Sequence, residues 1–173
     1  MCIRDREDTF ERLEEDFEIQ DGIFIRAGDY QFTENRVFVR SNRSKMISAD
    51  ARYSWGEFWD GTRESLSTGV TFTPSYRFST ELEWSHNDVE VSEGDFKTNL
   101  VTAKAVYAFN NRTFLNALIQ YNTDVEEIAS NIRFNFIHHP LSDFFLVYNE
   151  RRSTTGEVID WALTAKLTYL FAF

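Results

Sequence analysis

The sequence lacks a long hydrophobic run, and it has a single cysteine, the residue that stabilises many small folds through disulfides or metal sites. A transmembrane helix needs about 18 to 20 consecutive apolar residues, whereas the longest stretch without Asp, Glu, Lys or Arg, residues 65–76, is full of Ser and Thr. This excludes a helical membrane span. Cys2 is the only cysteine, so a disulfide framework and a thiolate zinc site are excluded as well.

Basic residues are also scarce, with 18 Lys and Arg against 28 Asp and Glu and a formal net charge of −10. This balance argues against nucleic acid and anionic lipid headgroups as the main partner. Aromatic residues are abundant, with 17 Phe, 7 Tyr and 4 Trp against only 2 Pro and 7 Gly. Because aromatic side chains favour strands and membrane interfaces, any association with a membrane must depend on strands.

Polar and apolar residues alternate along most of the chain. From Arg36 onward, segments of roughly 9 to 13 residues with this period are separated by turn residues, the weak pattern of membrane β-barrels. Short turns and longer polar links alternate between the segments, as expected when periplasmic turns are short and external loops are long. We predict about nine antiparallel strands, at residues 35–41, 45–57, 63–73, 76–87, 97–109, 112–123, 130–138, 142–151 and 158–173.

Each predicted strand has one apolar face and one mixed polar face, because successive side chains point to opposite sides. Tyr53, for example, falls on the face opposite to Asp50 and Arg52. These charges would form the wall of a pore or solute site, or a lattice of ion pairs that neutralises buried charge. Their mixed signs favour the lattice. The charged residues predicted to face a barrel lumen are Asp50, Arg52, Glu81, Glu83, Lys104 and Arg133.

Strand length favours a membrane barrel over a soluble fold. A soluble sandwich also alternates, but in strands of about 5 to 6 residues, whereas a tilted bilayer is crossed by about 9 to 11 residues. Aromatic residues are also predicted to form two belts at the strand ends. One belt comprises Trp55, Phe58, Trp59, Trp84, Tyr121, Tyr148 and Trp161, and the other comprises Phe72, Tyr76, Phe78, Tyr107, Phe109, Phe114 and Phe136.

The predicted fold class is therefore all-β, an antiparallel up-and-down transmembrane β-barrel. Because single-chain bacterial barrels usually have an even number of strands, about nine strands indicate an incomplete barrel. The alternative is a soluble secreted β-sandwich or lectin-like module, and a barrel-embedded hydrolase is disfavoured because no nucleophile and base stand together in the pattern.

The chain divides into three parts. Residues 1–6 run directly into an acidic stretch and lack the apolar core of a signal peptide. They look like translated adapter sequence, so we expect a non-native leader on the C-terminal piece of a longer protein. Residues 7–34 are expected to form an extracellular loop or lid with a short hairpin, and residues 35–173 to hold the barrel strands.

The C-terminal stretch alternates large apolar and polar or smaller side chains and ends on Phe173. Outer-membrane barrels close on such an amphipathic strand, which the barrel-assembly machinery adds to a sheet edge. We predict that deleting Phe173 lowers outer-membrane yield several-fold. The residues predicted to act as the assembly signal are Lys166, Tyr169, Phe171 and Phe173.

No pattern in the sequence indicates an enzyme, a cofactor or a metal site. His138 and His139 are adjacent at a strand end and point to opposite faces, so an ordinary turn at Pro140 is favoured over a metal pair. His86 has no nucleophile beside it in the pattern. The acidic residues around Gly94 do not have the spacing of an EF-hand loop, and a solvated loop is the favoured interpretation.

Several runs together resemble a known barrel. They are similar to the C-terminal barrel of an uncharacterised family of Gram-negative outer-membrane proteins. Members of that family carry a family-9-like carbohydrate-binding module ahead of the barrel. The similar runs are Ile23–Phe32, Phe58–Thr62, Thr73–Ser75, Ala117–Asn122, Asn131–Arg151 and Trp161–Phe173. This resemblance implies outer-membrane lipid and the barrel-assembly machinery as partners. It also implies carbohydrate as the ligand of an upstream module that this sequence lacks, and hence a barrel that anchors that module or passes material for it.

Overall fold

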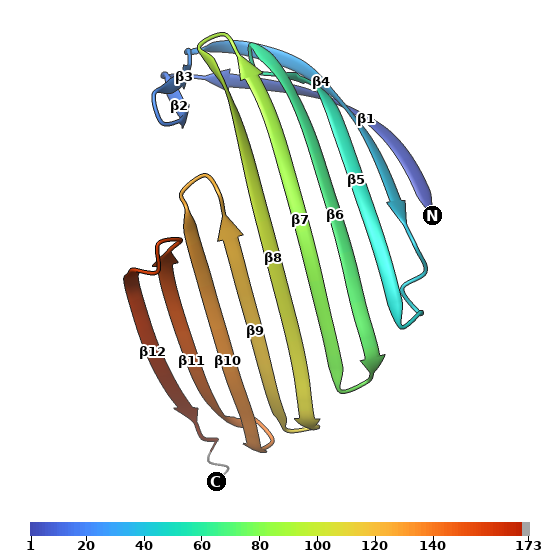
Figure 1. The fold of residues 1–173 in the computed structure, drawn as a ribbon, viewed down its shortest axis with the longest axis vertical. Helices are drawn as coiled ribbons and strands as arrows, with labels where there is room; N and C mark the ends of the chain where they lie inside the picture. The colour runs from blue at the N-terminus through green and yellow to red at the C-terminus, as the bar shows by residue number, and fades with distance from the viewer. Residues whose placement is uncertain (171–173) are drawn as a thin grey trace.

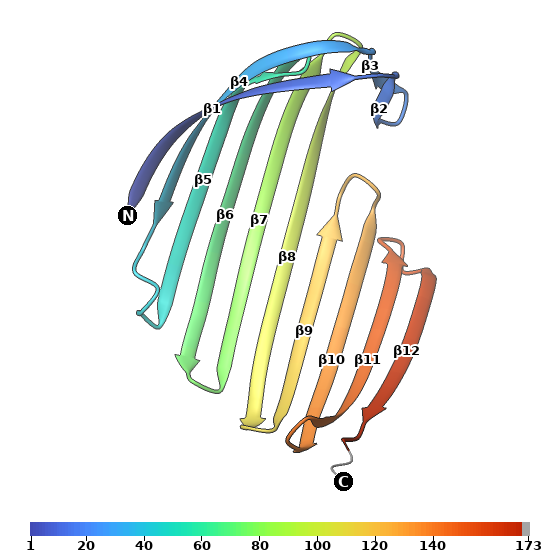
Figure 2. The ribbon, with the colours of Figure 1, turned by 180° about the vertical axis from the view of Figure 1, so that it is seen from behind.

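The computed structural model describes residues 1–170, which form β-strands and turns and no helix able to cross a membrane. Ten strands make one antiparallel sheet in which every neighbour is adjacent along the chain apart from one inserted hairpin (Figures 1 and 2). The strands of this sheet are β1 (Cys2–Leu13), β4 (Gly28–Arg40), β5 (Ile47–Phe58), β6 (Gly61–Ser75), β7 (Phe78–Val91), β8 (Gly94–Asn110), β9 (Thr113–Asn122), β10 (Glu127–His139), β11 (Ser142–Ser153) and β12 (Val158–Thr168). The inserted hairpin consists of β2 (Phe17–Gln20) and β3 (Ile23–Ile25).

The prediction of an all-β, antiparallel, up-and-down sheet is confirmed, and the strand number is corrected from about nine to ten. The additional strand is β1, which pairs along its whole length with β4. It begins inside residues 1–6, which the sequence analysis set aside, and Ile3 is aligned with Phe38. The origin of those six residues stays a prediction. β12 ends at Thr168, earlier than predicted, and residues 171–173 lie outside the described part of the chain.

The structure also differs from the predicted loops. The polar links expected at residues 57–63 and 87–97 are largely strand, and only residues 59–60 and 92–93 separate β5 from β6 and β7 from β8. Residues 7–34 are not one loop either, since their two ends belong to β1 and β4. The excursion from the sheet is limited to residues 14–27, which carry the predicted hairpin.

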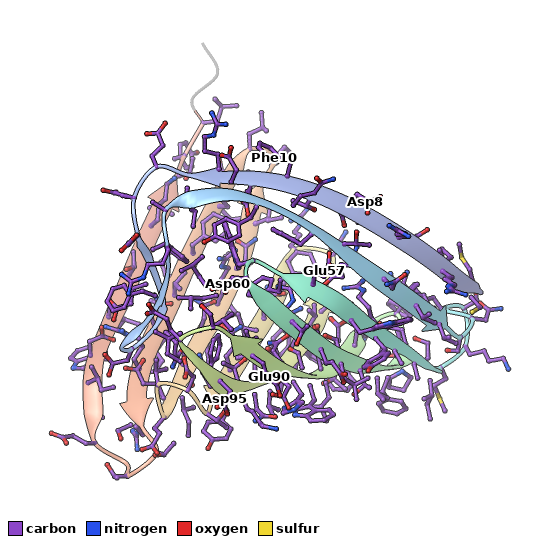
Figure 3. All side chains as sticks on the ribbon, turned by 90° about the horizontal axis from the view of Figure 1, so that it is seen from above. Asp8, Phe10, Glu57, Asp60, Glu90 and Asp95 are labelled. Carbon is purple, nitrogen blue, oxygen red and sulfur yellow. The ribbon has the colours of Figure 1, made fainter. Side chains whose placement is uncertain are left out.

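The sheet is curved, and its two faces differ in burial. Viewed along the strands, it bends around the space on one side of it, which stays open between the edge strands β1 and β12, and the β1–β4 ribbon crosses part of that space (Figure 3). We call the face toward that space the concave face and the other the convex face. Small residues of the concave face such as Ser54 are 7% exposed, whereas Ile47 and Leu82 on the convex face are 56% and 55% exposed. The described strands do not close into a barrel, because β1 and β12 are the two edges of the sheet.

Candidate functional site

The six predicted lumen-facing charges lie on the concave face. Asp50, Arg52, Glu81 and Glu83 line one hollow of about 170 Å³, together with Arg40 and Arg43. Lys104 is aligned with Glu81 on the neighbouring strand and forms an ion pair with it at 3.6 Å. Arg133 is apart from this group, on β10, where it is aligned with Asn116 and Val147. The structure therefore brings five of the six residues into one region.

Ion pairs extend over much of the concave face. Arg40 approaches Asp50 at 3.9 Å, and Arg151 lies 3.8 Å from Glu127 and 2.6 Å from Asp160 on its two neighbouring strands. Because acids and bases alternate from strand to strand, the face carries little unbalanced charge. This arrangement favours the ion-pair lattice over a wall selective for one sign of ion.

Glu34 is the most enclosed member of the lattice. Its two carboxylate oxygens accept hydrogen bonds from Arg36 and Arg63, both at 2.7 Å, and its side chain is 12% exposed. Arg36 also lies 3.5 Å from Glu7 of β1. A carboxylate that accepts charge-assisted bonds on both oxygens is held firmly, so Glu34 links β4 to β6 across the intervening strand β5.

Near one end of β5 to β8, at residues 57–64 and 88–97, the convex face becomes charged and the concave face becomes apolar. In the middle of β7, Leu82 and Trp84 lie on the convex face and Glu83 on the concave face. Beyond His86 the convex side chains are Asp88 and Glu90. The concave side chain between these two acids is Val89, which is only 3% exposed.

The concave side of this end contains an aromatic cluster. The ring of Trp59 lies 5.4 Å from that of Tyr30 and 5.8 Å from that of Phe32, in each case between centroids. The guanidinium of Arg63 lies 4.2 Å from the ring centroid of Phe58, a cation–π contact. Phe58 and Trp59 were predicted to belong to an outer belt, and this is corrected, because both pack against β4 on the enclosed side.

The other predicted aromatics of that belt lie on the convex face, as the strand registers show. Trp55 is aligned with Glu64 on that face, and Trp84 is aligned with Val101, which is in turn aligned with Tyr121. Tyr148 donates a hydrogen bond to Glu150 just beyond it. The convex aromatics therefore mark the height at which the face changes from apolar to charged.

The β2–β3 hairpin covers the apolar part of the concave face. Ile25 is fully buried, and the side chain of Ile23 packs against Gly94, where a Cβ would lie 3.1 Å from Ile23 Cδ1. Beneath the hairpin is a cavity of about 350 Å³. Its lining residues are Ile19, Gln20, Phe58, Arg63, Asn87, Val89, Phe96, Thr98 and Asp124.

Polar contacts tie the hairpin to two turns of the sheet. Arg26 forms an ion pair with Glu93, whose carboxylate also accepts a hydrogen bond from the Phe24 backbone N–H at 3.2 Å. Gln20 Nε2 donates to Asp124 Oδ1 at 2.6 Å. At the base of the hairpin, the Ala27 N–H and the Arg26 guanidinium both donate to Asp16, and they hold the pKa of that carboxyl below its usual range. The sequence placed a hairpin here but gave no indication of these long-range contacts.

The assembly signal is described in part. Lys166 is aligned with Phe145 on the concave face, and the ring of Tyr169 stacks on that of His138 with centroids 5.6 Å apart. The Leu170 N–H donates to Ser142 Oγ at 2.9 Å. Phe171 and Phe173, the other two predicted residues, lie outside the described residues.

No group of three or more metal-ligating side chains occurs among residues 1–170. His138 and His139 have their ring centroids 5.4 Å apart at a steep interplanar angle. His86 Nδ1 is hydrogen-bonded to Asn99 Oδ1 at 2.8 Å. Among the acidic residues near Gly94, Asp88 forms an ion pair with Lys97. Comparison of the chain with family models, curated proteins and solved structures gives no match.

Proposed function

We propose that this chain is part of an outer-membrane β-barrel that anchors, or passes material for, an external carbohydrate-binding module. The observation that carries the membrane part is the apolar band of the convex face, bounded by aromatic residues and followed by charged ones. On β8 the band runs from Val101 to Phe109, roughly 27 Å along the strand at about 3.4 Å per residue. At a tilt of about 40° this spans about 21 Å of bilayer, near the height of about 25 Å usual for such bands.

The concave face supports the same proposal. Several of its charges form ion pairs across strands, which offsets part of the cost of placing charge in a barrel interior, and the described residues provide no second large sheet to cover the convex side chains. The alternative, a soluble β-sandwich or lectin-like module, would need such a layer. The carbohydrate module, the Gram-negative origin and the assembly machinery rest on the sequence resemblance alone.

Refolding with and without lipid tests the proposal. We expect the chain to require detergent or phospholipid vesicles for its β-structure, and to aggregate when denaturant is diluted into plain buffer, because the convex band would be exposed to water. The measurement is circular dichroism and sedimentation of both preparations. A monodisperse, folded chain in detergent-free buffer would overturn the membrane proposal and favour the soluble module.

A further inference from the structure

We propose that the β2–β3 hairpin is a gate, latched by its contacts with Glu93 and Asp124, that closes one end of the concave space. This inference rests on the proposed barrel where it concerns passage through a membrane. The opening and closing of the hairpin itself can be tested without a membrane. The hairpin can move as a unit because it pairs only with itself and is joined to the main sheet through residues 14–16 and 26–27.

The hairpin is too small to hold its position unaided. β2 and β3 comprise 4 and 3 residues, and an isolated two-stranded hairpin is marginally stable in water at best. Its place over the sheet therefore depends on its contacts with other elements. These comprise one apolar anchor, formed by Ile25 and Ile23, and a few polar ties.

The polar ties bridge two separate parts of the sheet. The contacts of Phe24 and Arg26 with Glu93 reach the turn between β7 and β8, while the Gln20 contact with Asp124 reaches the turn between β9 and β10. The hairpin itself leaves the sheet between β1 and β4. It therefore connects the β1–β4 ribbon to turns on the other side of the concave space, and Figure 1 shows it beside the β7–β8 turn.

The polar contacts that hold the hairpin to the sheet are weak. Arg26 is 65% exposed in its side chain, and ion pairs at such exposed positions are weak and screened by salt. Segments held by few buried contacts open locally while the rest of the structure stays folded. Release of the hairpin would remove Ile19 and Gln20 from the wall of the 350 Å³ cavity and so widen access to its other lining residues, among them Phe58, Phe96 and Thr98.

The first experiment measures access to the cavity. In a Cys2→Ser background, Thr98→Cys places a single thiol in the cavity wall, and its rate of modification by a maleimide reports hairpin opening. We expect Glu93→Gln, which removes the charge facing Arg26, to raise this rate by about 1.5-fold to fivefold, and 0.5 M salt to raise it in the parent as well. The matched control is Glu90→Gln, on the convex face of the same strand end, which should leave the rate unchanged. Equal rates for Glu93→Gln and Glu90→Gln would overturn the gate.

The second experiment locks the gate. Gln20→Cys and Asp124→Cys, joined by a short thiol cross-linker in the Cys2→Ser background, should reduce solute efflux from vesicles at least severalfold, and the Gln20→Cys single variant should show no such loss. Efflux that is unchanged by cross-linking in an inserted chain overturns the gate and leaves the barrel standing. If the chain does not insert into vesicles, the labelling experiment decides the gate alone.

Discussion

Ala105 and Val106 are adjacent on β8 and face opposite sides of the sheet, so arginine at each position tests what covers the convex face. Ala105 lies in the middle of the apolar band, four residues from Val101 and from Phe109. It is aligned with two small residues, Thr80 and Ala117, so there is room for a longer side chain. Val106 lies on the concave face and is 42% exposed.

The two substitutions differ in cost only if the convex face meets hydrocarbon. Arginine at the bilayer midplane of a barrel costs about 2 to 4 kcal/mol, which lowers the folding equilibrium constant by a factor of roughly 30 to 1,000. On a water-covered surface the same substitution usually changes stability by about 0.5 kcal/mol or less. We therefore expect Ala105→Arg to cost about 2 to 4 kcal/mol and Val106→Arg about 1 kcal/mol or less.

The assay is reversible urea unfolding from phospholipid vesicles, followed by tryptophan fluorescence. Trp84 and Trp161 lie on the convex face, so their emission should shift as the face leaves the lipid. Asn99→Arg is a further control, because it lies on the same face of the same strand beyond the aromatic residues, where the cost falls to about 0 to 1 kcal/mol. Equal losses for Ala105→Arg and Val106→Arg would refute the reasoning.

Three further predictions concern the sheet and the hairpin. Gly61→Ala should destabilise the chain by about 1 to 3 kcal/mol, because a Cβ there would lie 1.9 Å from the Glu90 carbonyl oxygen, whereas Gly69→Ala meets only ordinary contacts near 3.6 Å and should be close to neutral in denaturant titration. Glu34→Ala should cost about 1 to 2 kcal/mol, because it removes the ion-pair partner of Arg63 and one of the two partners of Arg36. Glu34→Gln should cost less, so equal losses would argue against a role for the charge. Finally, folding lowers the pKa of Asp16, so its contribution to hairpin docking is present at neutral pH and is lost as the pH falls through that lowered pKa. The hydrogen-exchange rate of the hairpin amides should rise over that pH range. Asp16→Asn should abolish this pH dependence.

The sequence predicts the centres of the strands well because the period of two depends only on local geometry. Ile47 to Glu57 and Phe78 to His86 keep the predicted faces in the structure. The strand ends were missed for a physical reason. Asp88, Glu90 and Asp95 look like loop residues when each is weighed alone, yet the strand continues past them, with Val89 as the apolar side chain on the opposite face from Leu82.

The candidate site was predictable only in part. The six concave charges follow from side-chain alternation, but their pairing depends on register, and register is set by residues on other strands. Glu34 shows this, since its partner Arg63 is 29 residues away and belongs to a strand that does not neighbour β4. The contact of Gln20 with Asp124 joins residues 104 apart, and no local pattern contains that information.

The proposed membrane location would account for the exchange of faces along β7. The pairing of β7 with β8 continues without a register shift from Phe78 to Val91, so no bulge turns Val89 to the side opposite Leu82. In a soluble sandwich the core stays on one side of a strand, and the apolar residues should keep to one face over its whole length. The convex face of a strand that leaves a bilayer meets hydrocarbon within the membrane and water beyond it. Beyond the membrane, the apolar side chains of such a strand are buried only if another element covers the concave face. In this chain the β2–β3 hairpin covers that face, so under the proposed function the acids at Asp88 and Glu90 and the buried side chains of Val89 and Ile25 would have a single physical cause.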